Sequence, residues 1–138
     1  MWQRHELTNH VFDYYAKLKR RFKGMNIELC VAGSESKKSR QIAERHGWHY
    51  IETRNRPLSK KHNKVLQLAK KFNPDGVVLI GSDDIISDSV FTHYKDYLKG
   101  GGEHPIGFRD CYLIWHNYTG YWSGYINHRA GESIGSRS

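Results

Sequence analysis

The amino-acid sequence predicts an α/β fold in which helices cover both faces of an open, mostly parallel sheet, giving three layers. Within the first hundred residues, short apolar stretches alternate with longer stretches in which apolar residues recur every three or four positions. Strands that alternate with helices pair in parallel, and such a sheet is covered by helices. After residue 101 the sequence becomes rich in aromatic and turn residues, which predicts a short antiparallel C-terminal part.

Four helices are predicted, and the first shows the clearest apolar spacing. Steps of four, four, three and four residues, typical of one helical face, separate Leu7, Val11, Tyr15, Leu18 and Phe22. Glycine often follows the last residue of a helix, as at position 47, and proline, as at position 74, cannot continue one. The predicted helices are residues 6–22, 34–47, 56–72 and about 88–98.

Three parallel strands are predicted over residues 26–32, 48–53 and 76–80. The last of these, GVVLI, is the most strand-like piece of the chain, and its apolar run is typical of a central strand buried on both faces. Residues 106–128 are predicted to form one or two antiparallel strands, with turn signals at Asn117 and Gly120. Six aromatic residues in that stretch either stack on a sugar or, as the more common role, pack across the strands. They are Tyr112, Trp115, Tyr118, Tyr121, Trp122 and Tyr125.

The composition indicates a single basic domain. The 138 residues include 22 Lys and Arg against 14 Asp and Glu, for a formal net charge of +8. A basic surplus suits a polyanion such as a nucleic acid or a phosphorylated ligand, although most such residues lie on solvated helix faces. No apolar run approaches the length of a membrane span, no secretory signal is visible, and there are only two cysteines, so we expect a cytoplasmic protein.

The carboxyl ends of the three predicted strands are residues 32–34, 52–55 and 81–84, and each contains small or polar residues. Open parallel sheets bind ligands beyond the carboxyl ends of their strands. Because these ends are expected to meet at one edge of the sheet, the sequence predicts a ligand site there.

Two adjacent acids, Asp83 and Asp84, follow the most apolar strand. They either hold a divalent cation, which removes their mutual repulsion, or cap the next turn or helix. The basic stretch 60–63 opens the preceding helix, and acids beside such a helix start suggest a diphosphate bridged by a metal. The sequence contains neither the glycine-rich dinucleotide fingerprint nor a P-loop.

The stretch NRPLSKKHNKVLQLAKKFNPDGVVLIGSDDIIS resembles the nucleotide-binding half of GT-A fold glycosyltransferases of the family 2-like sort. These proteins carry an Asn-x-Pro-Leu-x-x-Lys-x-Asn segment at a helix start, and then a strand that ends in an acidic DXD signature. The resemblance covers about residues 2–90. It implies a Rossmann-like sheet, a Mn²⁺ or Mg²⁺ cofactor, and the transfer of a sugar from a nucleotide diphosphate donor, taken as a UDP-sugar, to an unknown acceptor.

The resemblance also implies roles for individual residues. Asp84 corresponds to the last acid of the signature, which ligates the metal, and Asp83 to its middle position, with Ser82 where many members have the first Asp. The remaining positions implied to bind the nucleotide are Arg4, Gly33, Ser34, Asn55, Lys61 and Asn63.

Residues 1–100 are expected to be the nucleotide-binding half of one domain, and residues 101–138 part of the acceptor side. Family members begin with a full strand, where only Met1 precedes Trp2 here, and continue beyond Arg137, which predicts a minimal form or a fragment. The missing strand would leave part of the sheet unpaired unless the N-terminus, or a neighbouring subunit in a homo-oligomer, fills its place. The candidate catalytic bases are Asp110 and Glu132.

Two other functions stay open. The short C-terminal part favours a catalytically degenerate module that binds a nucleotide without transferring the sugar. The basic surplus favours a nucleic-acid-binding domain, but none of the common nucleic-acid-binding motifs is present, and the acids would repel a polyanion. We therefore expect a nucleotide-sugar rather than a nucleic acid as the partner.

Overall fold

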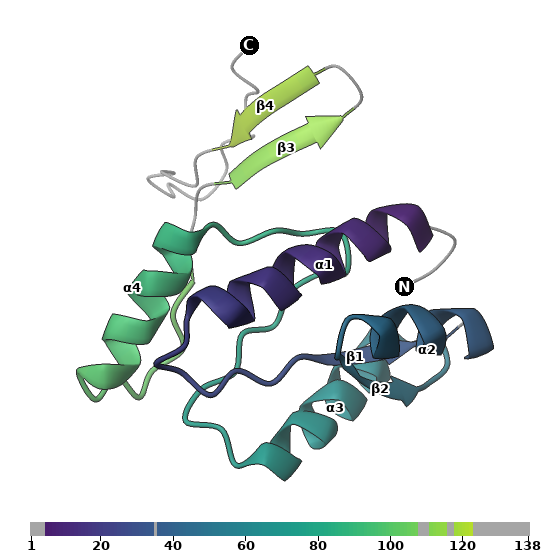
Figure 1. Cartoon of the computed structure of the whole chain (residues 1–138), viewed down its shortest axis with the longest axis horizontal. Helices are drawn as coiled ribbons and strands as arrows, with labels where there is room; N and C mark the ends of the chain where they lie inside the picture. The colour runs from purple at the N-terminus through teal and green to yellow at the C-terminus, as the bar shows by residue number, and fades with distance from the viewer. Residues whose placement is uncertain (1–4, 35, 108–110, 116–117, 123–138) are drawn as a thin grey trace, which may run out of the picture. The chain divides into compact units, whose positions relative to one another are not determined.

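The chain is a mixed α/β protein with two compact units, residues 1–102 and 103–138 (Figure 1). The structure is a computed structural model, and it describes residues 5–34, 36–107, 111–115 and 118–122. No helix in these described ranges is long and apolar enough to cross a membrane.

The first unit contains four α-helices and two strands among its described residues, in the order that the sequence predicts. Its elements are α1 (His5–Arg21), β1 (Cys30–Gly33), α2 (Ser36–Arg45), β2 (His49–Glu52), α3 (Leu58–Ala69), the short 3₁₀-helix η1 (Lys70–Phe72) and α4 (Asp88–Lys99).

The two strands of the first unit pair in parallel, as the alternation of strands and helices predicts. Val31 lies opposite Tyr50, and Gly33 lies opposite Glu52. Both α2 and α3 pack against this strand pair (Figure 1). The pair therefore carries its two carboxyl ends to one edge.

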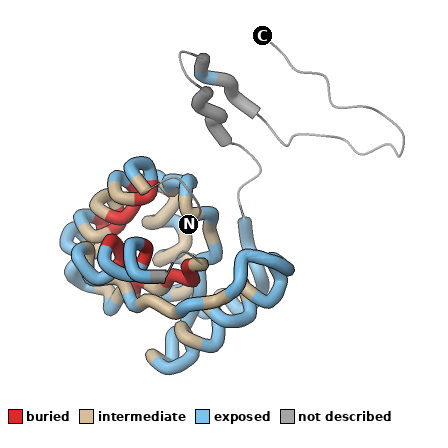
Figure 2. The backbone as a smooth tube through the Cα atoms, turned by 90° about the vertical axis from the view of Figure 1, so that its right-hand side faces the viewer, coloured by how far each residue is buried: buried red, intermediate tan, exposed pale blue. Residues whose placement is uncertain are grey.

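The core of the first unit is built around one face of α1. Val11, Phe12 and Leu18 are each only 1% exposed, and they pack with apolar residues of β1 and α2 (Figure 2). The ring of Phe12 stacks on Trp48, with their centroids 4.1 Å apart. Leu7, predicted to lie on the buried face, is instead 43% exposed, because the face that packs is centred one residue further along the helix.

The predicted helix ends agree with the backbone. Gly47 follows α2 with φ of +73°, a left-handed conformation that glycine adopts without a steric cost. Asn73 ends η1 with φ of +48°, and Pro74 comes next. Asparagine is among the few other residues that tolerate this region.

The prediction of a central strand over residues 76–80 is wrong for the described structure. The segment joins neither sheet, and Val77 and Leu79 are 52% and 49% exposed, while Ile80 packs against the core. A strand exists only where a neighbouring strand accepts and donates its backbone hydrogen bonds. No described residue supplies such bonds to Val77, Val78 or Leu79.

The second unit contains an antiparallel pair, β3 (Cys111–Trp115) and β4 (Tyr118–Trp122), which confirms the predicted antiparallel strands. Leu113 lies opposite Gly120, so the turn predicted at Gly120 is wrong, because this residue is paired inside β4. Asn117 lies outside the described residues, as do the side chains needed to test stacking of the aromatic residues.

Candidate functional site

The carboxyl ends of β1 and β2 lie side by side. The Thr53 N–H donates to the Gly33 carbonyl at 2.8 Å, which extends the parallel ladder past the last residue of β2. Two of the three predicted strand ends therefore meet at one edge, where open parallel sheets bind their ligands. The third predicted strand end, at residues 81–84, is hydrogen-bonded to α1 through Tyr15.

Gly33 is a close-packing position. A Cβ atom added there would lie 2.7 Å from the Tyr50 hydroxyl oxygen, so only glycine leaves room for that ring. The next residue, Ser34, has a buried Oγ with no hydrogen-bond partner in the described part of the chain. This strand end is therefore closely packed, and the Ser34 hydroxyl is a buried polar group without a hydrogen-bond partner among the described residues.

The start of α3 brings two of the predicted residues together. Lys61 Nζ donates to Asn55 Oδ1 at 3.3 Å, and both are contributed by the segment that follows β2. Pro57, the residue before α3, has no side chain that could cap the N–H groups of the first turn of the helix. Asn63 is exposed, and no described residue contacts its side chain by a hydrogen bond. The helix start therefore keeps donors available for a ligand.

Cations gather at this edge, and none of them forms an ion pair with a described acid. The first turns of α2 and α3 contain no acid. Helix N-termini favour anions, so cations placed there are electrostatically unfavourable unless an anion joins them. No ion pair within the described ranges involves the cations at this edge, which are Lys37, Arg54, Arg56, Lys60 and Lys61.

The predicted acidic pair lies in a tight turn. Asp84 Oδ2 accepts a hydrogen bond from the Gly81 N–H at 3.0 Å, and the Asp84 N–H lies 3.4 Å from the Gly81 carbonyl oxygen. Asp84 thus caps the turn, which was one of the two predicted roles. The following helix is capped by Ser87, whose Oγ accepts from the Val90 N–H at 3.4 Å.

Two tyrosines of α1 hold the segment that follows this turn. The Tyr15 hydroxyl accepts from the Ile86 N–H at 2.9 Å and lies 3.2 Å from the Asp84 carbonyl oxygen, to which it donates. The Tyr14 hydroxyl donates to the Ile86 carbonyl at 2.7 Å. The segment between α3 and α4 consequently runs along α1 (Figure 1).

An exposed ion pair secures the start of α4 to the same helix. Arg21 Nη2 lies 2.6 Å from Asp88 Oδ1. Hydrogen bonding to Asp88 raises the pKa of the Arg21 guanidinium. These contacts were not predicted, because the tyrosines and Arg21 belong to a helix far away in sequence.

The acidic turn offers a suitable ligand set for Mn²⁺ or Mg²⁺. Asp83 and Asp84 are exposed, Ser82 is half-buried, and only one oxygen of Asp84 is used by the turn. No cluster of three His, Cys, Asp or Glu side chains exists in the described part of the chain. Mg²⁺ is typically held by one or two carboxylates, with water and substrate phosphates completing its shell, so two carboxylates fit it.

Three predicted site residues, Arg4, Asp110 and Glu132, lie outside the residues that the structure describes. The nucleotide-binding role of Arg4 and the roles of Asp110 and Glu132 as catalytic bases stay predictions.

Comparison with protein-family models, curated proteins and solved structures found no significant match. The functional argument therefore depends on the residues at the strand ends and at the acidic turn.

Proposed function

We propose that the protein is a metal-dependent glycosyltransferase of the GT-A type, which binds a UDP-sugar and transfers the sugar to an acceptor. The proposal includes a Rossmann-like, three-layer sheet. It is supported by the order of the sequence segments and by the parallel pairing of β1 and β2, against which α2 and α3 pack.

The observation that carries the proposal is the contact between Lys61 and Asn55 at the start of α3. It supports the proposal because both residues follow β2 at the start of α3, a helix start with no side-chain cap. A diphosphate needs charge-assisted donors, and backbone N–H groups at a helix start together with a lysine supply them. Nucleotide binding at this edge explains why cations are found where the helix dipole disfavours them.

In the proposed reaction, Lys61 holds a phosphate oxygen of the donor. Asp83 and Asp84 would hold Mn²⁺ or Mg²⁺, which would supply positive charge to neutralise a nucleoside diphosphate. The Asp84 carboxylate keeps its bond to the Gly81 N–H through one oxygen and offers the other. Asp110 and Glu132 are the candidates for the base that removes the acceptor's proton.

Calorimetry with UDP, GDP and CDP, each with and without Mn²⁺, tests the donor site. We expect UDP to bind only weakly without Mn²⁺, and Asp84→Asn to weaken Mn²⁺-dependent binding about tenfold or more, because it removes a charged ligand. Asp75→Asn is the matched control, since Asp75 is an exposed acid outside the proposed site. Equal, metal-independent binding of all three nucleotides by both variants would contradict the proposal.

Release of the sugar from a UDP-sugar, measured with and without added acceptors, separates a transferase from a degenerate nucleotide-binding module. A transferase releases UDP faster when its acceptor is present. A module binds UDP and Mn²⁺ with the same dependence on Asp84 but does not turn over.

The cations at the strand ends also favour a second candidate, a nucleic-acid-binding domain. Their phosphate-binding chemistry is shared by both functions, but binding to a polyanion weakens steeply as salt rises, since it releases counterions. Tight, salt-sensitive binding of single-stranded DNA, with no Mn²⁺-dependent binding of UDP, would support this candidate and exclude the transferase.

A further inference from the structure

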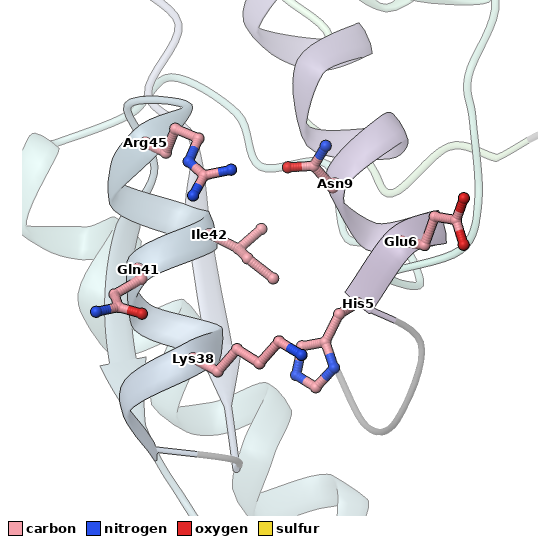
Figure 3. A pocket seen from close by; sticks show the side chains of 7 residues that line it. All are labelled: His5, Glu6, Asn9, Lys38, Gln41, Ile42 and Arg45. Atoms are coloured by element: carbon pink, nitrogen blue, oxygen red, sulfur yellow. The ribbon is translucent and has the colours of Figure 1, made fainter.

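A pocket of about 320 Å³, lined by both charged and apolar side chains, lies between α1 and α2 (Figure 3). None of the described residues of the proposed nucleotide site lines it. Its walls are formed by His5, Glu6 and Asn9 of α1, and by Lys38, Ile42 and Arg45 of α2. The volume is at the lower end of the range for small-molecule sites.

Two cations of α2 give this pocket its charge. Lys38 and Arg45 are seven residues apart, which places them on one face of the helix about 10 Å apart along its axis. Neither has an ion pair with any residue that the structure describes. The acid of this helix, Glu44, pairs with Arg40, with Oε1 and Nη1 4.0 Å apart. Arg40 does not line the pocket.

The side chains of Lys38 and Arg45 extend from α2 toward α1, with Ile42 between them (Figure 3). Glu6 is the acid in the wall, so the two cations leave the lining with a positive balance. Ile42 is 7% exposed and gives the pocket an apolar floor.

Asn9 adds a hydrogen-bond donor to the opposite wall. Its Oδ1 is 2.9 Å from His46 Nε2, an interaction that fixes the amide and leaves its NH₂ group available. The pocket thus combines two separated cations, a neutral donor and an apolar floor between them. Such a lining matches a molecule with an anionic group at each end and a short carbon chain in the middle.

We propose that the pocket between α1 and α2 binds a small organic dianion. One anionic group pairs with Lys38 and the other with Arg45, and the carbon chain of the ligand lies on Ile42. The site is separate from the proposed nucleotide site and does not depend on it.

Glutarate and butyrate provide a matched pair of probes, because butyrate lacks the second carboxylate. In titrations of ¹⁵N-labelled protein followed by NMR, we expect glutarate to shift the amide signals of Asn9 and Ile42. Glutarate should bind about tenfold or more tightly than butyrate, since a second charge-assisted contact contributes to its affinity. Absence of glutarate binding, or equal affinity for the two probes, overturns the proposal.

Variants of α2 test which of its cations bind the dianion. Lys38→Gln and Arg45→Gln should each weaken glutarate binding about tenfold, whereas Arg40→Gln, which removes the same charge from the same helix, should not. Equal weakening by all three variants would indicate a general charge effect and overturn the proposal. Asp84→Asn should leave glutarate binding unchanged, so failure of this site and failure of the nucleotide site are distinguishable.

Discussion

At the scale of single residues, Tyr15 makes the most consequential contact in the structure. Its side chain is 5% exposed and belongs to the core of the first unit. Its hydroxyl nevertheless reaches the backbone of Asp84 and Ile86, the first of which is 69 positions away. One side chain therefore both fills the core and positions the acidic turn.

We expect Tyr15→Phe to lower the free energy of unfolding by about 1–2 kcal/mol, because it keeps the ring but leaves the Ile86 N–H and the Asp84 carbonyl without this partner. Urea unfolding followed by circular dichroism measures the change. An unchanged free energy of unfolding would contradict the role given to the hydroxyl.

The same variant carries a pH signature. Burial raises the pKa of Tyr15 to about 12, above the ordinary value of about 10 for tyrosine. Since the folded state holds the proton more tightly than the unfolded state, this contribution to stability is complete below pH 10 and is lost as pH rises toward 12. The free energy of unfolding of Tyr15→Phe should therefore fall less than that of the wild type between pH 10 and 12. As the control, the free energies of unfolding of the two proteins should change with pH in the same way below pH 9.

At the scale of secondary-structure elements, the pairing of β1 and β2 depends on a close approach at Gly33. The ring of Tyr50 occupies the space that a side chain at position 33 would need. The Gly33 carbonyl also accepts the hydrogen bond from the Thr53 N–H that joins the two strand ends. Packing and backbone pairing therefore fix the edge together.

Gly33→Ala should destabilise the first unit by about 1–3 kcal/mol, the usual cost of overpacking, because the Tyr50 ring has to move. Gly24→Ala is the matched control, since a Cβ atom at position 24 meets nothing within 4 Å. Thermal unfolding of the two variants checks the difference, and equal midpoints would mean that the ring yields without cost.

The elements that the sequence predicted correctly are those specified by local patterns. Apolar spacing defined the helices, and Gly47 and Pro74 marked two of their ends. Asn55 and Lys61 were predicted as site residues, and the hydrogen bond between them, six positions apart at one helix start, is a finding of the structure.

The failures depend on distant partners. An apolar run such as residues 76–80 does not reveal whether a second strand lies beside it. The hold of Tyr15 on the acidic turn is likewise invisible, because its spacing in α1 is that of any core residue. The local pattern gave the turn at Asp83 and Asp84, but not what fixes it.

At the scale of the whole molecule, the exposed segment of residues 77–79 is the main liability of the first unit. Its side chains are 52%, 43% and 49% exposed. Exposed apolar segments with unpaired backbone groups promote association with other chains. We therefore expect this segment to dominate the binding of apolar probes and the tendency to self-associate.

Val78→Lys should reduce the fluorescence of the neutral dye Nile red bound to the protein, and should shift the protein toward smaller species at high concentration. Leu7→Lys is the matched control, because Leu7 is 43% exposed, as Val78 is, but belongs to helix α1 and not to the exposed segment. Dye fluorescence and light scattering provide the measurements. Equal effects of the two variants would show that the segment has no special role.

The cations at the starts of α2 and α3 also have a practical consequence. Helices that begin with cations and without acids carry an electrostatic cost in the folded state, and a bound anion relieves it. Any anion that binds the folded chain but not the unfolded one stabilises it by mass action. The choice between phosphate and chloride as the buffer anion is therefore expected to change the free energy of unfolding. Melting temperatures of the protein are comparable only when they are measured with the same anion at the same concentration.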